Sequence, residues 1–289
     1  MTLPISRRNL LKLTAAASAS TMLGCSSQAS TDGWQQGNVQ HILPLASANS
    51  FNIKVSFTQP QSGVKLKVNN NHHVGVQEDS AGRFFSFVIA NLAPATQYQL
   101  QLFDLDHQPL CDNWPLKTLP SLDADVSNLT LACFTCAGGP DWPVIWDKHG
   151  FKPVTYRKAL FNILLKDKPD VVIANGDHIY WDFHSWVDNR EGWLAKTAMQ
   201  KMLDMKGQFD ESLPVMGSVN EQTLINIADE QLAGIYGVAF RSTPVLFITD
   251  DHDYFDNDDS TPQKTTFPPN QFHQDLRDTL QRFYFPEFI

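Results

Sequence analysis

Three short apolar runs in the second half of the chain limit its fold, because each leads directly into residues that can bind metal. The runs are Leu129 to Phe134, Val171 to Ala174 and Val245 to Ile248. Short, almost continuous apolar runs are typical of strands buried in a parallel sheet. Ligands bind at the carboxyl ends of such strands in open α/β sheets. We therefore expect an α/β fold with a site where these runs end.

The second run leads into the segment Asn175-Gly176-Asp177-His178-Ile179-Tyr180. The two oxygens of an aspartate can bridge two cations, and a glycine before it lets the backbone turn sharply. We therefore expect Asp177 to be a bridging metal ligand. The phenol oxygen of Tyr180 favours iron over magnesium as the metal. The alternative is an ordinary turn, since Gly-Asp pairs often follow strands for that reason alone.

The third run ends in the acidic cluster Asp250-Asp251-His252-Asp253. Asp251 is a candidate metal ligand, and His252 is a candidate acid catalyst that protonates a leaving oxygen or stabilises a developing charge. Aspartate runs are also common at solvated starts of helices. The second and third runs together favour a metal site, because both have the pattern of a buried strand and the segment between them has room for helices.

Two cysteines accompany the first run: Cys133 lies inside it, and Cys136 follows it in a loop that glycines open. We expect Cys136 to join the metal site as a thiolate ligand and Cys133 to be a small buried residue. One alternative is that both are buried. Another is a CxxC redox pair or half of a zinc site, although neither a second CxxC nor a thioredoxin-like helix start follows.

Further aromatic side chains surround these motifs. His178 and His184 flank the first cluster, which contains Asp177 and Tyr180, and could support the metal ligands. Tryptophans in the same segments either line a substrate cleft or simply pack. They are Trp142, Trp146, Trp181, Trp186 and Trp193.

With Thr135-Cys136, Gly176 to Tyr180 and Asp250 to Asp253 in this order, the chain resembles the alkaline phosphatase D branch of the calcineurin-like metallophosphoesterases over residues 33 to 289. That family has a Ser-Cys pair, a Gly-Asp-x-x-Tyr turn and an Asp-Asp-His-Glu cluster followed by asparagines around an iron and calcium centre. In this sequence Asp253 stands in place of the glutamate, and Asn257 lies downstream.

The resemblance implies a metal site and a reaction. Cys136, Asp177 and Tyr180 would hold Fe³⁺, and Asp177 would bridge to Ca²⁺. Asp251 would bind on the side of the second metal, and His252 would lie near the leaving group. The chain would be a metal-dependent phosphoric ester hydrolase of the alkaline phosphatase type, in which metal-bound hydroxide attacks a phosphate ester. The alternatives are a phosphodiesterase or phospholipase of the same fold, and a noncatalytic surface lipoprotein with a remnant metal fold.

The family also uses histidine and acidic ligands from later strands, and no segment of this sequence matches them. We therefore expect an incomplete catalytic domain whose C-terminal half is missing. This departure puts the activity of the chain in doubt, but it leaves the fold and the first metal ligands in place.

The first residues predict export. The segment Ser6 to Lys12 matches the twin-arginine signal, and the stretch after it is too short and too polar to span a bilayer. Met22 to Cys25 resembles a bacterial lipobox, in which Cys25 would carry the lipid; the alternative is cleavage at another small residue. We expect a periplasmic or cell-surface protein whose membrane contact is this lipid anchor.

The charge of the chain points to cations as partners. The formal net charge is −9 and the isoelectric point is about 5.4, which argues against nonspecific nucleic-acid binding. Together with the acidic clusters, this favours metal ions as partners, whereas the phosphate-ester substrate is implied by the family resemblance.

Composition shifts divide the chain into three parts. We expect residues 1–32 to hold the signal, the lipobox and a tether, and residues 33–120 to form an all-β sandwich of fibronectin type III or immunoglobulin type. We expect residues 121–289 to form an α/β domain, half of an αββα sandwich, which the resemblance implies is a metallophosphoesterase domain. The signals for the sandwich are strand-like runs at 51–57, 64–68 and 84–89 and a tyrosine-corner segment at 92–100. Apolar spacing predicts helices at 156–165, 194–206 and 221–236, with a connecting loop over 260–269.

Overall fold

The structure is a computed structural model that describes residues 33–140, 144–145, 148–149, 151–180, 200, 203–254 and 270–287. Gln35–Ile289 form one compact unit. The domain boundary near Pro120 stays a prediction. Other predicted features lie outside the described residues: the export signal with Cys25, the tryptophans Trp142, Trp146, Trp181, Trp186 and Trp193, His184, Asn257 and the loop 260–269.

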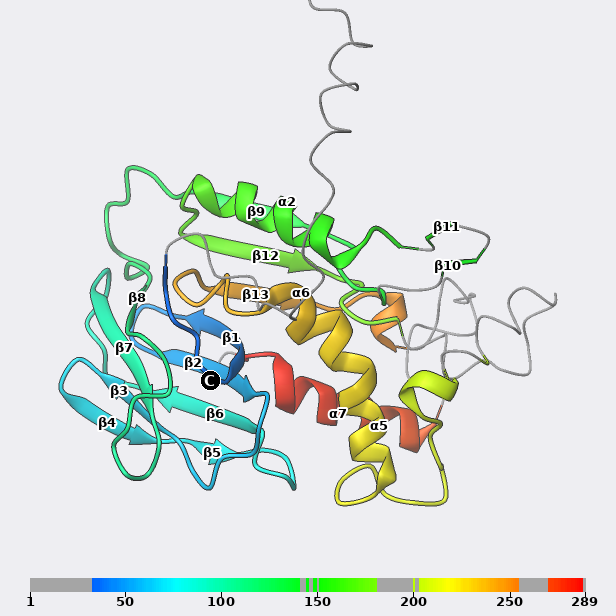
Figure 1. Cartoon of the computed structure of the whole chain (residues 1–289). Helices are drawn as coiled ribbons and strands as arrows, with labels where there is room; N and C mark the ends of the chain where they lie inside the picture. Colours follow the sequence, from blue (N-terminus) through cyan, green and yellow to red (C-terminus); the bar gives the residue numbers. More distant parts are fainter. Residues whose placement is uncertain are drawn as a thin grey trace, which may run out of the picture. The chain divides into compact units, whose positions relative to one another are not determined.

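The first part of the unit forms two antiparallel sheets (Figure 1). The first has the order β1-β2-β6-β5, with β1 (Val39–Ala46), β2 (Phe51–Phe57), β5 (Val76–Gln77) and β6 (Phe84–Ile89). The second has the order β4-β3-β7-β8, with β3 (Lys65–Val68), β4 (Asn71–Val74), β7 (Gln97–Phe103) and β8 (Trp114–Lys117). The predicted strands over 51–57, 64–68 and 84–89 are therefore present as β2, β3 and β6.

Tyr98 on β7 makes the hydrogen bond expected of a tyrosine corner. Its hydroxyl accepts a hydrogen bond from the backbone N–H of Ala93 at 2.7 Å. Its ring packs edge-on against Phe51 of β2, with 5.8 Å between the ring centroids. Tyr98 thereby fixes the turn before β7 and links the two antiparallel sheets. The fibronectin-type or immunoglobulin-type topology of these sheets stays a prediction.

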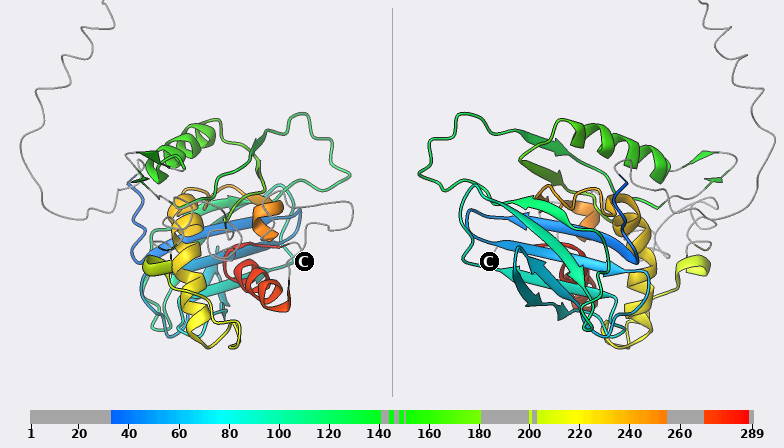
Figure 2. Two further views of the ribbon diagram at one scale, coloured as in Figure 1. Left: turned by 90° about the vertical axis from the view of Figure 1, so that its right-hand side faces the viewer. Right: turned by 60° about the vertical axis from the view of Figure 1, so that its left-hand side comes forward.

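The three apolar runs form a parallel sheet. Its order is β13-β12-β9, with β9 (Leu131–Phe134), β12 (Val171–Asn175) and β13 (Val245–Ile248). Both neighbours pair with β12 in parallel, with Ala174 opposite Phe134 on one side and Phe247 on the other. The helix α2 (Val154–Lys166) connects β9 to β12, as the sequence predicts, and lies against one face of the sheet (Figures 1 and 2). A short antiparallel pair, β10 (Val144–Ile145) and β11 (Lys148–His149), precedes α2.

The helix predicted over 221–236 forms, but it contains a turn of π-helix. It consists of α5 (Val219–Ala228), η1 (Asp229–Ala233) and α6 (Gly234–Tyr236), and the Ser218 side chain caps its start by accepting from the Asn220 N–H. After β13 follow a 3₁₀ turn, η2 (Asp251–Tyr254), and a final helix that the sequence analysis missed, α7 (Gln271–Tyr284). Among the described helices, none is both long and apolar enough to cross a membrane.

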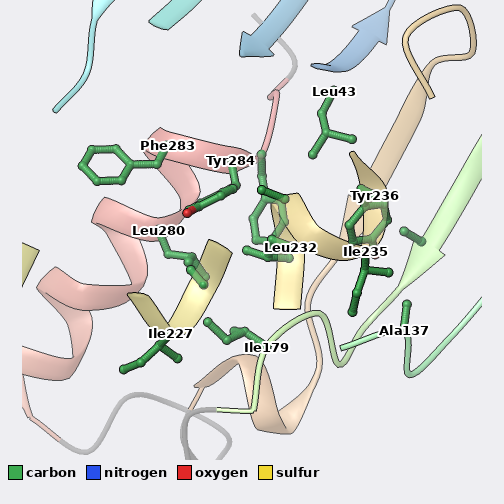
Figure 3. Close-up of a cluster of buried hydrophobic side chains, with 14 of the residues drawn as sticks. Leu43, Ala137, Ile179, Ile227, Leu232, Ile235, Tyr236, Leu280, Phe283 and Tyr284 are labelled. Atoms are coloured by element: carbon green, nitrogen blue, oxygen red, sulfur yellow. The ribbon is translucent and has the colours of Figure 1, made fainter. Parts of the chain in front are cut away.

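One apolar core joins these elements (Figure 3). It contains Leu43 and Phe84 from the first antiparallel sheet, which pack with residues of the parallel sheet and the helices. Phe84 stacks on Phe283 of α7 at 4.7 Å between centroids. Tyr236, at the end of α6, packs against Phe161 of α2 at 5.4 Å. The first antiparallel sheet, the helices and the parallel sheet share this core, so each of them stabilises the packing of the others.

The other face of the parallel sheet is less buried than its apolar runs predict. Leu131 and Ile248 are 56% and 45% exposed, and Cys133 is exposed as well. Side chains alternate between the faces of a strand, so Leu131 and Cys133 share a face while Ala132 and Phe134 pack toward the core. The prediction that Cys133 is buried is therefore wrong, because among the described residues the core covers the opposite face of the sheet.

His41 on β1 is expected to make the free energy of unfolding depend on pH. Burial lowers its pKa from 6.5 to about 3, and the positive charges of Arg83 and Lys54 lower it further in the same direction. Between these pH values the unfolded chain binds a proton at His41 and the folded chain does not. The contribution of His41 is therefore present above about pH 6.5 and is lost as the pH falls toward 3, by up to about 1.4 kcal/mol per pH unit.

The check is urea unfolding of the wild type and His41→Gln between pH 7 and 5, with the exposed His107→Gln as the control. We expect the free energy of unfolding of His41→Gln to fall less steeply with decreasing pH than that of the other two proteins. Equal slopes in all three would show that His41 titrates alike in the folded and unfolded chains.

Candidate metal centre

The loops that follow the three parallel strands lie at one edge of the sheet, because neighbouring parallel strands end at the same edge. They carry Cys136 after β9, Asp177 after β12, and Asp251 with His252 after β13. The backbone turns sharply in two of them, since Cys136 and Asp177 have φ values of 55° and 56°. Such a conformation is uncommon for residues other than glycine, and it marks candidate functional sites.

The first and second loops approach each other through backbone contacts. The Cys136 N–H donates to the carbonyl of Gly176 at 3.2 Å, and the Gly138 N–H donates to the carbonyl of Asp177 at 2.8 Å. A Cβ on Gly138 would lie 2.5 Å from backbone atoms of His178, so only glycine fits there. The first loop is also held by α2: the buried Arg157 of this helix donates from one guanidinium nitrogen to the carbonyls of Ala137, Gly138 and Gly139.

The carboxylate of Asp177 lies where the predicted ligands meet. Its Oδ2 accepts hydrogen bonds from the Cys136 thiol and the Tyr180 hydroxyl, both at 3.2 Å. Its Oδ1 is buried and has no hydrogen-bond partner among the described residues. A buried carboxylate oxygen without a partner is costly, which a cation at this position would offset. The donor set therefore fits a bound metal ion.

Asp251 and His252 complete the group on the third loop. One ligand atom from each of Asp177, Asp251 and His252 lies within 4.8 Å of the others. The imidazole of His252 also packs on the Tyr180 ring, with 4.1 Å between the centroids. The structure thus brings together all five predicted site residues, Cys136, Asp177, Tyr180, Asp251 and His252. Cys133 is not among them.

The protonation of Cys136 follows from its surroundings. Partial burial raises the pKa of its thiol, the hydrogen bond with Thr135 lowers it, and the hydrogen bond to the Asp177 carboxylate raises it again. The thiol is therefore a hydrogen-bond donor in the protein without metal, and a bound cation would be needed to favour the thiolate. None of the three described cysteines, Cys111, Cys133 and Cys136, forms a disulfide.

Asp253 has a role that sequence reasoning missed. Its side chain is buried, and its two oxygens accept hydrogen bonds from the backbone N–H groups of Asp177, His178, Ile179 and Asp250 at 2.8 to 3.1 Å. Burial raises the pKa of this carboxyl, while His178 and the accepted hydrogen bonds act in the opposite direction. Asp253 therefore holds the second and third loops together and is not placed as a metal ligand. The acidic cluster drew attention to Asp253, but the sequence did not indicate that this side chain is buried.

His178 supports the same region from within the core. It is fully buried; its Nδ1 lies 3.1 Å from the Tyr236 hydroxyl and its Nε2 lies 2.9 Å from the carbonyl oxygen of Ile248. A neutral ring satisfies both contacts when Nε2–H donates to the carbonyl and Nδ1 accepts from the hydroxyl. His178 thus links the ends of β12 and β13, in agreement with the supporting position that the sequence suggested.

Replacing Asp253 by asparagine should destabilise the protein. One acceptor oxygen becomes an NH₂ group that faces backbone donors, which leaves buried N–H groups unsatisfied at a cost of about 1–3 kcal/mol. The measurement is the free energy of unfolding in urea, with the exposed Asp250→Asn as the control, expected to change by less than about 0.5 kcal/mol. An Asp253→Asn protein as stable as the control would show that the four hydrogen bonds contribute little.

Comparisons with known proteins bear on the fold. No family model and no curated protein matches the chain. A solved structure of PhoD is similar, with a TM-score of 0.52 and 16% sequence identity over 84% of this chain and 44% of that chain. The purple acid phosphatase PPD1 from yellow lupin (Lupinus luteus) seeds gives a TM-score of 0.48 and 10% identity over 86% and 41% of the two chains. The chain spans less than half the length of either structure. At this identity the likeness to PhoD concerns the fold alone.

Proposed function

We propose that this chain carries part of the active site of a metal-dependent phosphoric ester hydrolase of the alkaline phosphatase type. One observation carries the proposal: the Cys136 thiol and the Tyr180 hydroxyl converge on one oxygen of Asp177, whose other oxygen is buried without a partner among the described residues. The likeness of the fold to PhoD supports it.

The residues divide the binding of two cations between them. Cys136, Tyr180 and one oxygen of Asp177 would hold Fe³⁺, because thiolate and phenolate donors suit such an ion. The other oxygen of Asp177 and the carboxylate of Asp251 would hold Ca²⁺, which prefers carboxylate oxygens. When bound, the cations supply a nucleophilic water at neutral pH and offset the charge of the phosphoryl oxygens.

His252 would donate a proton to the leaving oxygen or stabilise the charge that develops there. Its contact with the Tyr180 ring holds the imidazole beside the centre, and its nitrogen lies near the carboxylate oxygens of Asp177 and Asp251. The substrate is a phosphate ester. The same residues serve monoesters and diesters, so a phosphodiesterase or phospholipase is the second candidate.

The first test is metal analysis of the purified protein together with turnover of a chromogenic phosphate monoester and a diester. We expect bound iron and calcium. Asp177→Asn should lose metal and turnover together, whereas His252→Ala should keep metal and lose about 10²- to 10⁴-fold in turnover. Cys133→Ser is the matched control, because Cys133 is exposed and lies outside the centre.

Three outcomes would overturn parts of this assignment. A folded wild-type protein without metal would refute the metal centre. Equal metal loss in Asp177→Asn and His252→Ala would make His252 a ligand and not the acid catalyst. Metal with no turnover would favour the remnant metal fold of a noncatalytic lipoprotein.

We further propose that the chain is exported by the twin-arginine route and anchored through a lipid on Cys25, both of which concern residues outside the described part. Replacing Arg7 and Arg8 together by lysine should retain the protein in the cytoplasm, because the paired arginines are the recognised feature. Cys25→Ala should leave export intact and release the protein from the membrane fraction. Fractionation that finds the double variant exported as before would sink the first proposal.

A further inference from the structure

A glutamine outside every sequence motif lies between two loops of the metal centre. Gln231 belongs to the π-helical turn η1 and is fully buried. Its Oε1 accepts hydrogen bonds from the backbone N–H groups of Gly139 and Tyr180, both at 2.9 Å. Gly139 belongs to the loop that starts at Cys136. One oxygen atom therefore connects the loop of the thiol with the residue that carries the phenol.

This contact completes a series along the second loop. The N–H groups of Asp177, His178 and Ile179 donate to Asp253, and that of Tyr180, the next residue, donates to Gln231. Asp253 thus fixes the carboxylate end of the turn, while Gln231 fixes the phenol end. The two acceptors come from different elements, η2 and η1.

The turn that carries Gln231 is itself held from two sides. The π-helical turn inserts an extra residue into the helix, a feature that is frequent at functional sites. At its first residue, Asp229, one carboxylate oxygen accepts from Arg83 at 2.8 Å and the other accepts from the Tyr284 hydroxyl at 2.6 Å. Arg83 immediately precedes β6, and Tyr284 ends α7. Gln231 is therefore anchored to the first antiparallel sheet and to the last helix.

The other half of the Gln231 amide is left without compensation. The backbone groups of Gly139 and Tyr180 that face the Gln231 side chain are both N–H donors, so the amide oxygen, and not the amide nitrogen, must point toward them. Its nitrogen is buried and has no hydrogen-bond partner among the described residues. A buried donor without a partner costs about 1–3 kcal/mol. An apolar side chain would avoid the cost of the buried nitrogen. The hydrogen bonds that the oxygen accepts are therefore what favours a glutamine at this position.

We propose that Gln231 is a positioning residue: its amide oxygen fixes the Tyr180 backbone and the Cys136 loop at the separation that lets the Tyr180 hydroxyl and the Cys136 thiol reach Asp177. This inference rests on the proposed metal centre for its functional meaning, while the hydrogen bonds themselves exist without metal. Gln231 touches neither substrate nor cation in this role.

The test compares Gln231→Met, which has a similar length and no accepting oxygen, with Gln231→Glu, which keeps the acceptor. Amide hydrogen exchange is measured on the metal-free proteins. In Gln231→Met we expect the amides of Gly139 and Tyr180 to exchange at least about tenfold faster, with those of Asp177, His178 and Ile179 unchanged because Asp253 still holds them. Gln231→Glu should restore the slow exchange.

Metal binding gives the second readout, a titration with Co²⁺ alone followed by visible absorption. Gln231→Met should bind Co²⁺ about 10- to 100-fold more weakly than the wild type, as is usual when a supporting partner of a ligand is lost. Gln231→Glu should recover most of this affinity. Should Gln231→Met fail to fold, Gln231→Asn retracts the oxygen by one methylene and should show the same two losses.

The outcomes separate this proposal from the proposed function. Unchanged exchange at Gly139 and Tyr180, or faster exchange throughout the core, would overturn the positioning role of Gln231. The positioning role would also be overturned if Gln231→Met bound Co²⁺ as tightly as the wild type although its Gly139 and Tyr180 amides exchanged faster. A wild-type protein that binds no Co²⁺ while the exchange pattern holds would overturn the metal centre and show that Gln231 orders the two loops for another purpose.

Discussion

The hydrogen bonds accepted by the buried carboxylate of Asp253 are the interaction on which the metal centre most depends. They join the loop after β12 to the loop after β13. The N–H groups of Cys136 and Gly138, which donate to the carbonyls of Gly176 and Asp177, add the loop after β9. The parallel strands bring the three loops to one edge, but strand pairing alone does not set the direction of a side chain. Asp253 sets the direction of the Asp177 side chain, because its carboxylate fixes the backbone of Asp177 and of the residues that follow.

The antiparallel sheets contribute to this arrangement through the shared core. Phe84 packs on α7, and Arg83 beside it binds the start of η1. From η1, Gln231 reaches the loops of the centre. A continuous set of contacts thus leads from a strand of the first sheet to the proposed ligands, which gives that sheet a part in holding the centre.

The sequence predicted those features that depend on local pattern. The runs before Asp177 and Asp251, the helix α2 and the strand β2 were recognisable because apolar spacing and turn residues are properties of neighbouring positions. Asp253 and Gln231 were missed because, apart from the Asp250 N–H, their partners are backbone amides far away in the sequence. The burial of Cys133 was predicted wrongly because it depends on which face of the sheet is covered. The helix α7 was missed although its buried Leu276, Leu280 and Phe283 have helical spacing.

The more exposed face of the parallel sheet has a consequence for the behaviour of the protein in solution. Leu131 and Ile248 expose apolar surface on the outer strands, β9 and β13, of a short sheet. Exposed apolar patches favour association between molecules. Molecules of this protein can therefore aggregate through this face while each of them keeps its native packing.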